Sequence, residues 1–306
     1  MNLIAIAGPT AVGKSEIALL LAEKIRGEII SVDSMQVYRG LDIGTAKPSA
    51  EQRRRVRHHL TDVADLNESF DAARFVRLAT EAIADIQRRG ATAILCGGTG
   101  FYFQALFEGL GDAPAADPKL RRELEITPLP VLLQELAERD PVTFESIDRK
   151  NPRRVVRAVE VIRLTGRPFS EQRARWGFKG ARAKTAELLV LTRKQEDLHA
   201  RINSRVDEMF RRGVVAETAQ LLRRGLAQNQ TACQAIGYRQ VIEHLEGRRD
   251  LRETIELVKT KTRQFARRQL TWFRKYGSAR FIELESEATP ASSMAQLEEY
   301  VEHIQP

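Results

Sequence analysis

A phosphate-loop motif lies near the start of the chain. The pattern G-x-x-x-x-G-K-[ST] is filled by Gly8, Pro9, Thr10, Ala11, Val12, Gly13, Lys14 and Ser15. In this motif the glycines let backbone N–H groups surround phosphate oxygens at a helix N-terminus, the lysine adds a positive charge, and the final hydroxyl can hold Mg²⁺. The sequence therefore predicts that the loop binds a phosphate compound, with Ser15 as the magnesium ligand.

A carboxylate follows the second apolar run of the chain. Asp33 comes directly after residues 29–32, and ligand sites of doubly wound folds lie at the carboxyl ends of their strands. The next apolar run, residues 91–96, ends in G-G-T-G and lacks the acid with which nucleotide-hydrolysing enzymes commonly order magnesium. Asp33 is therefore the candidate catalytic group, with a turn or helix cap as its alternative role.

The elements that must position these residues alternate between strand and helix. Continuous apolar runs predict buried parallel strands at residues 3–7, 29–32 and 91–96, and apolar residues at helical spacing predict helices at 16–26 and 75–86. Together with the phosphate loop, this pattern predicts an α/β fold with a P-loop NTPase-like core, whose mostly parallel sheet is flanked by helices.

A change in composition marks a second region. Gly, Pro and Asp punctuate residues 111–118, after which the chain is helical in pattern and rich in Arg to about residue 180. A strand-like run then returns at residues 187–191. We expect a catalytic core of residues 1–111 and 181–306 that ends in helices, interrupted by a helical insertion domain at residues 112–180.

The charge balance fits a polyanionic partner, with a genome that prefers Arg codons as the alternative explanation. The 306 residues include 49 Lys and Arg against 41 Asp and Glu, a net charge of +8. Cations concentrate at residues 149–157 and, with aromatic residues between them and no acid, at residues 257–276. In a helix the second segment would place four cations on one face: Lys259, Arg263, Arg267 and Arg274. The alternative is an ordinary solvated basic helix.

Several classes of protein do not fit the composition. Two cysteines and five scattered histidines provide neither a disulfide framework nor a zinc-ligand spacing. The apolar N-terminal run is too short for a signal peptide or a membrane span. We therefore expect a soluble cytoplasmic protein that makes no contact with a membrane.

Seven motifs in order along the chain resemble the tRNA dimethylallyltransferases, also called tRNA isopentenyltransferases. They are G-P-T-A-x-G-K-S at 8–15, V-D-S-M-Q-V-Y at 32–38, D-I-G-T-A-K-P at 42–48, H-H-L at 58–60, G-G-T-G-F-Y at 97–102, I-G-Y-R-Q at 236–240 and R-Q-L-T-W-F at 268–273. These enzymes transfer a dimethylallyl group from dimethylallyl diphosphate to N6 of the adenosine 3′-adjacent to the anticodon. The resemblance implies that activity, with the tRNA anticodon stem-loop as partner.

The resemblance also implies roles for single residues. The phosphate loop would hold a diphosphate leaving group together with Mg²⁺, Thr10 would contact its bridging region, and Arg205 would stabilise its charge. Arg205 shares a helix predicted at residues 197–212 with Arg201, and for both arginines a solvated helix face is the alternative. Prenyl transfer to a weakly nucleophilic amine is helped by a general base, for which Asp33 is the candidate.

The positions expected to contact tRNA are spread over the chain. The Gln36 amide could pair with the donor and acceptor edge of adenine. The full set is Asp33, Ser34, Met35, Gln36, Thr99, Arg121, Arg153, Arg154, Arg157, Gln234, Ala235, Ile236, Gly237, Tyr238, Arg239, Arg267, Arg268, Gln269, Thr271, Trp272 and Arg274.

Two other functions fit parts of the sequence. A P-loop kinase for a small metabolite would use Asp33 as its base and Arg121 or Arg122 in a lid. The missing acid after residues 91–96 and the long basic C-terminal region speak against it. An RNA-binding protein with nucleotide as a structural ligand would leave Asp33 and Arg205 without a task. For the transferase we expect a monomer, since one subunit suffices to hold one stem-loop.

Overall fold

A computed structural model describes residues 3–172, 188–277, 279–286 and 288–301 of the chain. The chain divides into two compact units, one formed by Met1–Phe107 with Ala181–Pro306 and the other by Glu108–Gly180. We call them the core unit and the inserted unit. The predicted boundary near residue 180 and the first residue of the expected strand at 187–191 lie outside the described residues.

The core unit is built on a parallel sheet with the strand order β3-β2-β4-β1-β5-β6. All of its strand pairs are parallel. The strands are β1 (Leu3–Ala7), β2 (Glu28–Val32), β3 (His58–His59), β4 (Ala93–Gly97), β5 (Leu188–Thr192) and β6 (Ala279–Glu283). The predicted α/β fold with a mostly parallel sheet is thereby confirmed.

The register of the central strands brings three loops to one edge of the sheet. Gly97 at the end of β4 pairs with Ala7 at the end of β1 and with Val32 at the end of β2. The phosphate loop, Asp33 and the loop after β4 therefore leave the sheet side by side, because carboxyl ends of parallel strands meet at one edge.

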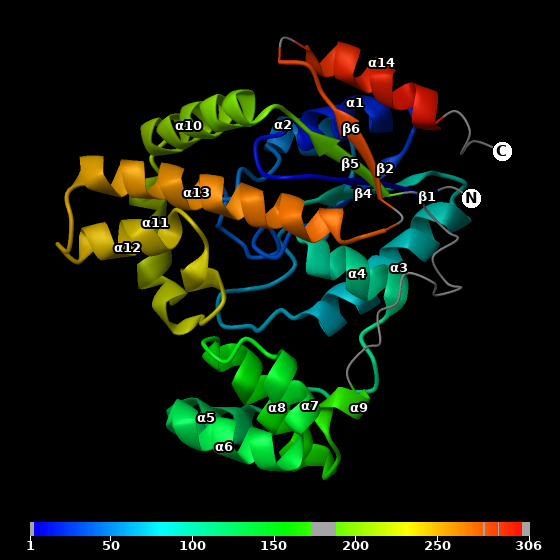
Figure 1. Cartoon of the computed structure of the whole chain (residues 1–306). Helices are drawn as coiled ribbons and strands as arrows, with labels where there is room; N and C mark the ends of the chain where they lie inside the picture. The colour runs from blue at the N-terminus through cyan, green and yellow to red at the C-terminus, as the bar shows by residue number, and fades with distance from the viewer. Residues whose placement is uncertain (1–2, 173–187, 278, 287, 302–306) are drawn as a thin grey trace. The chain divides into compact units, whose positions relative to one another are not determined.

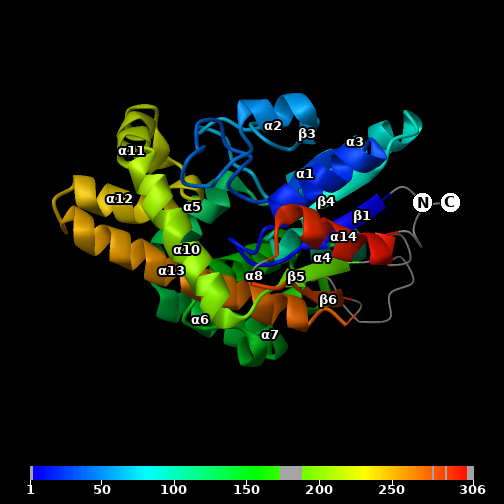
Figure 2. The same ribbon diagram turned by 90° about the horizontal axis from the view of Figure 1, so that it is seen from above.

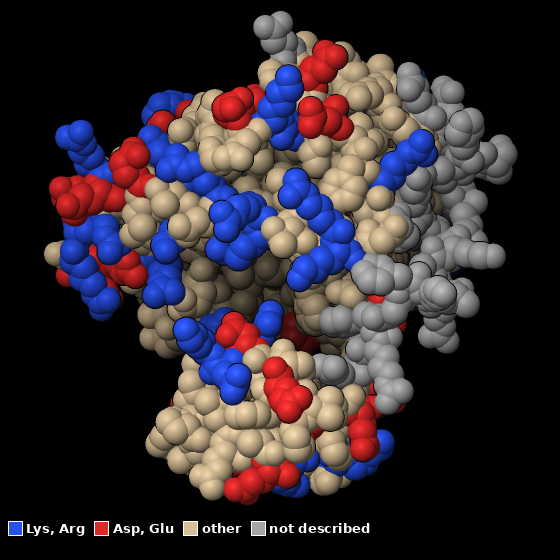
Figure 3. Space-filling model, in the orientation of Figure 1, with Lys and Arg blue, Asp and Glu red and all other residues tan. Residues whose placement is uncertain are grey.

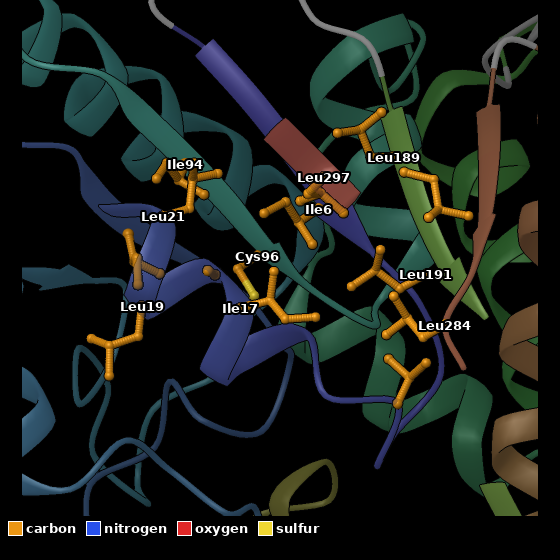
Figure 4. Packing of buried hydrophobic residues seen from close by; sticks show 14 of the residues in the cluster. Ile6, Ile17, Leu19, Leu21, Ile94, Cys96, Leu189, Leu191, Leu284 and Leu297 are labelled. Atoms are coloured by element: carbon orange, nitrogen blue, oxygen red, sulfur yellow. The ribbon is translucent and has the colours of Figure 1, made fainter. Parts of the chain in front are cut away.

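Helices cover both faces of this sheet. Figures 1 and 2 show α1 (Lys14–Ile25) and α14 (Pro290–Val301) on one face, and α3 (Ala72–Arg88) and α4 (Gly100–Glu108) on the other. The short helix α2 (Ala50–Arg55) precedes β3. Figure 4 shows apolar side chains from three strands, α1 and α14 packed together, among them Ile6, Ile94, Leu189, Ile17 and Leu297.

Two strands were not predicted from the sequence. β3 has two residues and β6 has exposed residues around the buried Ile282, so neither forms a continuous apolar run. Both are edge strands. The third predicted strand begins at Ala93, two positions later than expected.

A group of helices follows β5 in the core unit. The long helices α10 (Gln195–Arg211) and α13 (Leu251–Arg274) pack against each other, as do α11 (Val214–Arg223) and α12 (Tyr238–Leu245). Two short 3₁₀ segments, Leu226–Gln228 and Ala232–Gln234, join α11 to α12. The apolar face of α10 is buried against the core through Leu198, Ile202 and Val206.

The named secondary-structure elements within residues 109–172, the described part of the inserted unit after α4, are all helices. This unit has its own apolar core from α5, α6 and α8, with buried Leu124, Leu136 and Val159. Asn151 caps the start of α8, with its side chain accepting a hydrogen bond from the backbone N–H of Arg154. The helices are α5 (Pro118–Ile126), α6 (Leu129–Arg139), α7 (Pro141–Ser146), α8 (Pro152–Thr165) and α9 (Phe169–Gln172).

Candidate active site

The phosphate loop joins β1 to α1 in a strained backbone conformation. Gly8 has φ +148°, and a Cβ there would lie 2.7 Å from the carbonyl oxygen of Leu191. Gly13, with φ +107°, begins α1, and Ala11 between them has φ +64°. The first N–H groups of α1 have no acceptors within the helix, so they are available to an anion at this end.

Two arginines hold the outer side of this loop. The Nε of Arg201 on α10 donates to the carbonyl oxygen of Ala11 at 3.0 Å, and the Nε of Arg193 donates to that of Val12 at 2.9 Å. Arg193 directly follows β5 and also donates to Asp197 and to the backbone of Glu285. The loop is thus fixed by its carbonyl groups, and the solvated role considered for Arg201 is wrong.

Lys14, Arg205 and Asp33 interact electrostatically in one pocket. The Lys14 ammonium donates to the carbonyl oxygen of Pro9 at 3.0 Å. Burial lowers the pKa of Lys14, and the charge of Arg205 lowers it further, while Asp33 acts in the opposite direction. Burial also lowers the pKa of Arg205, again opposed by Asp33. With two cations against one carboxylate, these three side chains favour an anionic ligand.

Asp33 caps the turn that follows β2. Its Oδ1 accepts hydrogen bonds from the backbone N–H groups of Met35 at 2.8 Å and Gln36 at 3.2 Å. Within the described part of the chain, no group donates to Oδ2. The turn-capping role considered for Asp33 is therefore real, and it uses one oxygen while the residue also lines the pocket.

The Gln36 amide is occupied by the protein itself. Its Nε2 donates to the carbonyl oxygens of Thr45 at 3.2 Å and Ala46 at 3.4 Å, and its Oε1 accepts from the Ser31 hydroxyl at 2.8 Å. The predicted pairing of this amide with adenine does not fit these contacts. Nearby, Thr99 Oγ1 accepts from the Ser34 N–H at 3.2 Å and joins the ends of β4 and β2.

A cavity of about 220 Å³ at this edge of the sheet brings many predicted residues together. They come from the phosphate loop, the ends of β2 and β4, helices α10 and α13, and the segment that precedes α12. The predicted residues that line it are Thr10, Lys14, Ser15, Asp33, Ser34, Met35, Gln36, Thr99, Arg205, Gln234, Ala235, Ile236 and Gln269.

One wall of the cavity was not predicted from the sequence. Val206, Met209 and Phe265 line it with Ile236 and form an apolar surface, and Thr45 adds a backbone carbonyl. Val206 and Met209 also belong to the buried apolar face of α10. The position of Met209 four residues beyond Arg205, on the same side of α10, was the available signal for a wall beside that guanidinium.

The basic helix α13 separates its cations into two sets. Lys259 pairs with Asp207 at 2.8 Å, and Arg263 donates to Asn203 at 2.8 Å, so both are bound to α10. The expected single phosphate-contacting face is therefore wrong for these two residues. The exposed face carries Lys261, Arg267, Arg268, Thr271, Arg274 and Lys275, and Figure 3 shows cationic side chains gathered over this helix.

The inner side of α13 reaches the phosphate loop. Gln269 is buried, its Oε1 accepts from the Thr10 N–H at 2.9 Å and its Nε2 donates to the carbonyl oxygen of Gly98 at 2.9 Å. Gly100 lies against Trp272, where an added Cβ would come within 2.2 Å of the indole. The sequence predicts that Gln269 contacts tRNA, but both the oxygen and the nitrogen of its side-chain amide are already bound within the protein.

The segment around residue 238 also divides into exposed and buried residues. Gln234 and Arg239 are exposed, and an Arg239 Nη donates to Gln234 Oε1 at 2.9 Å. Ala235, Gly237 and Tyr238 are buried.

The arginines of the inserted unit that are predicted to contact tRNA also divide into bound and exposed residues. Arg121 and Arg157 both bind the carboxylate of Glu160, which is fully buried. Arg157 also donates to the carbonyl oxygen of Pro114 at 2.5 Å, so it serves the internal packing of this unit. Arg153 and Arg154, at the start of α8, are exposed.

Fold and pocket together define an α/β protein with a P-loop-like core and a cationic site at the carboxyl edge of its sheet. The model of the IPP transferase family matches residues 36–276. The chain therefore belongs to the IPP transferase family, whose curated relatives are named tRNA dimethylallyltransferases, and it is a transferase.

Relatives resemble the chain over nearly all of its length. tRNA dimethylallyltransferase 2 of Geotalea daltonii is 44% identical, covering 92% of this chain and 88% of that protein. The tRNA dimethylallyltransferase of Geobacter metallireducens is 46% identical, covering 92% of each.

Solved structures agree with the fold. A tRNA isopentenylpyrophosphate transferase of Bacillus halodurans has a TM-score of 0.72 and 39% identity, covering 99% of this chain and 96% of that one. A eukaryotic dimethylallyltransferase, solved acting on tRNA, has a TM-score of 0.80 and 32% identity, covering 100% of this chain and 81% of that one. No helix in the described ranges combines the length and apolar character needed to span a membrane.

Proposed function

We propose that this protein transfers a dimethylallyl group from dimethylallyl diphosphate to N6 of the adenosine 3′-adjacent to the anticodon of tRNA. The observation that carries the proposal is the single cavity that combines the phosphate loop, Asp33 and Arg205 with an apolar wall. The relatives named tRNA dimethylallyltransferases support this choice of substrates.

In the proposed reaction a bond forms between N6 and the allylic carbon while the carbon–oxygen bond to diphosphate breaks. The electron pair of the broken bond leaves with the diphosphate, and the N6 proton passes to Asp33. The adenine amine is a weak nucleophile because its lone pair is delocalised into the ring, so a carboxylate that accepts its proton lowers the barrier. The turn that holds Asp33 Oδ1 leaves Oδ2 to receive the proton.

Charge on the departing diphosphate is stabilised by groups already in place. The N-terminus of α1, Lys14 and Arg205 supply the positive potential, and burial strengthens each electrostatic interaction with the leaving group. Thr10 is proposed to contact the bridging region of the diphosphate. The prenyl group lies against the apolar wall as its carbon–oxygen bond breaks, where it is shielded from water.

The donor set fits Mg²⁺ as the cofactor. The exposed Ser15 lines the cavity at the start of α1, and no group of three or more His, Cys, Asp or Glu within the described ranges could hold a metal ion. Mg²⁺ is usually bound by one or two protein groups together with substrate phosphates and water, so Ser15 with a diphosphate suits it. When bound, the ion would neutralise charge on the diphosphate oxygens.

The exposed cations are proposed to hold the anticodon stem-loop. Arg267, Arg268 and Arg274 on α13 and Arg239 on α12 would contact phosphates of the RNA, and Arg153 with Arg154 would add contacts from the inserted unit. The adenosine must leave its stack to reach Asp33 in the cavity, and unstacked loop nucleotides are the least costly to extrude.

A direct assay tests the proposal. The protein is incubated with Mg²⁺, dimethylallyl diphosphate and unmodified tRNA, and the digested nucleosides are analysed by mass spectrometry. We expect adenosine heavier by one dimethylallyl group, and none when the diphosphate is omitted. Release of phosphate from ATP without prenylated adenosine would support a small-molecule kinase and overturn the proposal.

A further inference from the structure

One wall of the cavity is a loop, residues 42–47, that also holds the pocket's arginine. Gly44, Thr45 and Ala46 line the cavity. The carbonyl oxygen of Thr45 accepts hydrogen bonds from an Arg205 Nη at 3.4 Å and from Gln36 Nε2 at 3.2 Å. The loop therefore contacts the guanidinium directly through the Thr45 carbonyl oxygen.

The middle of the loop is bound by a carboxylate from outside the cavity. Glu217 on α11 accepts hydrogen bonds from the backbone N–H of Ile43 at 2.9 Å and from that of Gly44 at 3.4 Å. The same carboxylate accepts the hydroxyl of Tyr238 at 2.5 Å. Neither Glu217 nor Tyr238 lines the cavity, so they contact its wall from behind.

Tyr238 packs directly on the loop backbone. Its hydroxyl accepts the Gly44 N–H at 3.1 Å, and a Cβ at Gly44 would lie 2.3 Å from its ring. Only glycine allows this approach. Burial, followed by the charge of Glu217, raises the pKa of Tyr238, so the hydroxyl stays a donor to the carboxylate.

The far end of the loop has an anchor of its own. The buried Lys47 ammonium contacts Asp42 at 2.7 Å, Asp62 at 2.6 Å and the carbonyl oxygen of Tyr38 at 2.8 Å. This network holds residues 42 and 47 in place. The position of the residues between them therefore depends on Glu217 and Tyr238, which bind Ile43 and Gly44.

We infer that Glu217 and Tyr238 are positioning residues for leaving-group stabilisation, acting on Arg205 through the carbonyl group of Thr45. This inference rests on the proposed function. It assigns to Tyr238 a role different from the tRNA contact that the family resemblance implies, because the Tyr238 side chain is fully buried and its hydroxyl is already bound twice.

The test compares Tyr238→Phe and Glu217→Gln, which preserve shape, with Arg239→Met, an exposed neighbour proposed to contact tRNA. Gln220→Ala, an exposed position on the same helix as Glu217, is the neutral control. Hydrogen–deuterium exchange of the peptide covering residues 41–47 reports on the loop without any substrate. Calorimetry with inorganic pyrophosphate and Mg²⁺ reports on the anion site, and filter binding at several salt concentrations reports on tRNA.

We expect both shape-preserving variants to speed exchange in residues 41–47 and to weaken pyrophosphate binding. Their kcat/KM for dimethylallyl diphosphate should fall roughly tenfold or more, as small displacements of a charged group do. Their tRNA affinity and its salt dependence should match the wild type. Arg239→Met should show the reverse pattern, with weaker tRNA binding and wild-type exchange.

Weaker tRNA binding by Tyr238→Phe with unchanged exchange and pyrophosphate affinity would overturn the inference in favour of direct RNA contact. If Tyr238→Phe does not fold, as judged by circular dichroism, Glu217→Gln carries the comparison. Failure of the wild type to prenylate tRNA would refute the proposed function separately. The exchange and pyrophosphate measurements report on the loop and the anion site without the prenylation reaction.

Discussion

Asp33 shows how one side chain serves both structure and chemistry. Its Oδ1 accepts two backbone N–H groups and fixes the turn after β2. This contact holds the carboxylate at the edge of the cavity, next to two cations whose pKa values it influences. The turn therefore orients the proposed base, and the two roles considered from the sequence are compatible.

This division of roles predicts the behaviour of Asp33→Asn. The amide oxygen of Asn can still accept both N–H groups, so the turn and the fold should persist. The amide cannot accept a proton, so kcat should fall by about 10²- to 10⁴-fold. Thermal unfolding and tRNA binding by filter assay should match the wild type. A variant that turns over at nearly the wild-type rate would show that another group accepts the N6 proton.

Single residues were predictable where the signal is local. The phosphate loop and Asp33 were found because glycine spacing and strand ends occupy neighbouring positions in the sequence. The partners of Gln269 and Tyr238 were not found, since Gln269 binds Thr10 across 259 positions and Tyr238 binds Gly44 across 194. Such pairs depend on how helices pack, which one sequence does not reveal.

At the scale of elements, α10 supports the phosphate loop as well as the cavity. Arg201 binds the carbonyl oxygen of Ala11, a non-glycine residue in the left-handed region. That conformation costs about 1 kcal/mol or more and persists only where neighbours enforce it. Arg201 therefore helps to keep the loop shaped for an anion.

Arg201→Met should weaken binding of inorganic pyrophosphate with Mg²⁺ by about tenfold, as loss of a charged hydrogen bond does. Arg212→Met is the matched control, because Arg212 is an exposed residue at the end of the same helix. Isothermal calorimetry on both variants separates the effects. Equal affinities for Arg201→Met and the control would show that the loop holds its shape without this arginine.

An ion network joins β2, β3 and α3 at the other end of the sheet. Glu28 binds His59 at 2.6 Å and forms two contacts with Arg89. The Arg89 hydrogen bond, the largest influence, and His59 lower the pKa of Glu28 from 4.5 to about 2, with burial opposing them. The ionised carboxylate is thus favoured in the folded protein.

Because the folded pKa lies below the unfolded value, this stabilisation is complete above pH 4.5 and is lost as the pH falls towards 2. Glu28→Gln should therefore reduce the free energy of unfolding by about 1–2 kcal/mol at pH 7, allowing for the partial exposure of Arg89. Urea unfolding at a series of pH values should show the gap to the wild type closing below pH 4.5. A gap independent of pH would contradict the assignment.

Among the strands, the buried ones could be predicted from the sequence, whereas the two at the edges of the sheet could not. β1 and β4 are buried along their whole length, so they read as continuous apolar runs. β3 and β6 lie at the edges, where few side chains need be apolar. Helix boundaries followed local capping, as Asn151 shows at the start of α8.

At the scale of the whole molecule, the net charge of +8 does not say how many cations are available to a partner. Cations bound within the fold must first be separated from those that face solvent. Arg121 and Arg157 neutralise a buried glutamate, and Lys259 and Arg263 bind α10. The composition pointed to a polyanion, but only the three-dimensional arrangement separates cations that hold the fold together from those that face solvent.

This sorting predicts which cations set the salt dependence of tRNA binding. Arg267 and Arg268 are exposed on α13, so their replacement by Ala should weaken binding and reduce the slope of log K against log salt by about 1 for each phosphate that is no longer neutralised. Lys259→Ala, on the side of α13 paired with Asp207, should lower stability slightly and leave the slope unchanged. Filter binding from low to moderate salt measures both. An unchanged slope in the double arginine variant would place the RNA on another face, whereas a reduced slope in Lys259→Ala would mean that the pair with Asp207 opens when RNA binds.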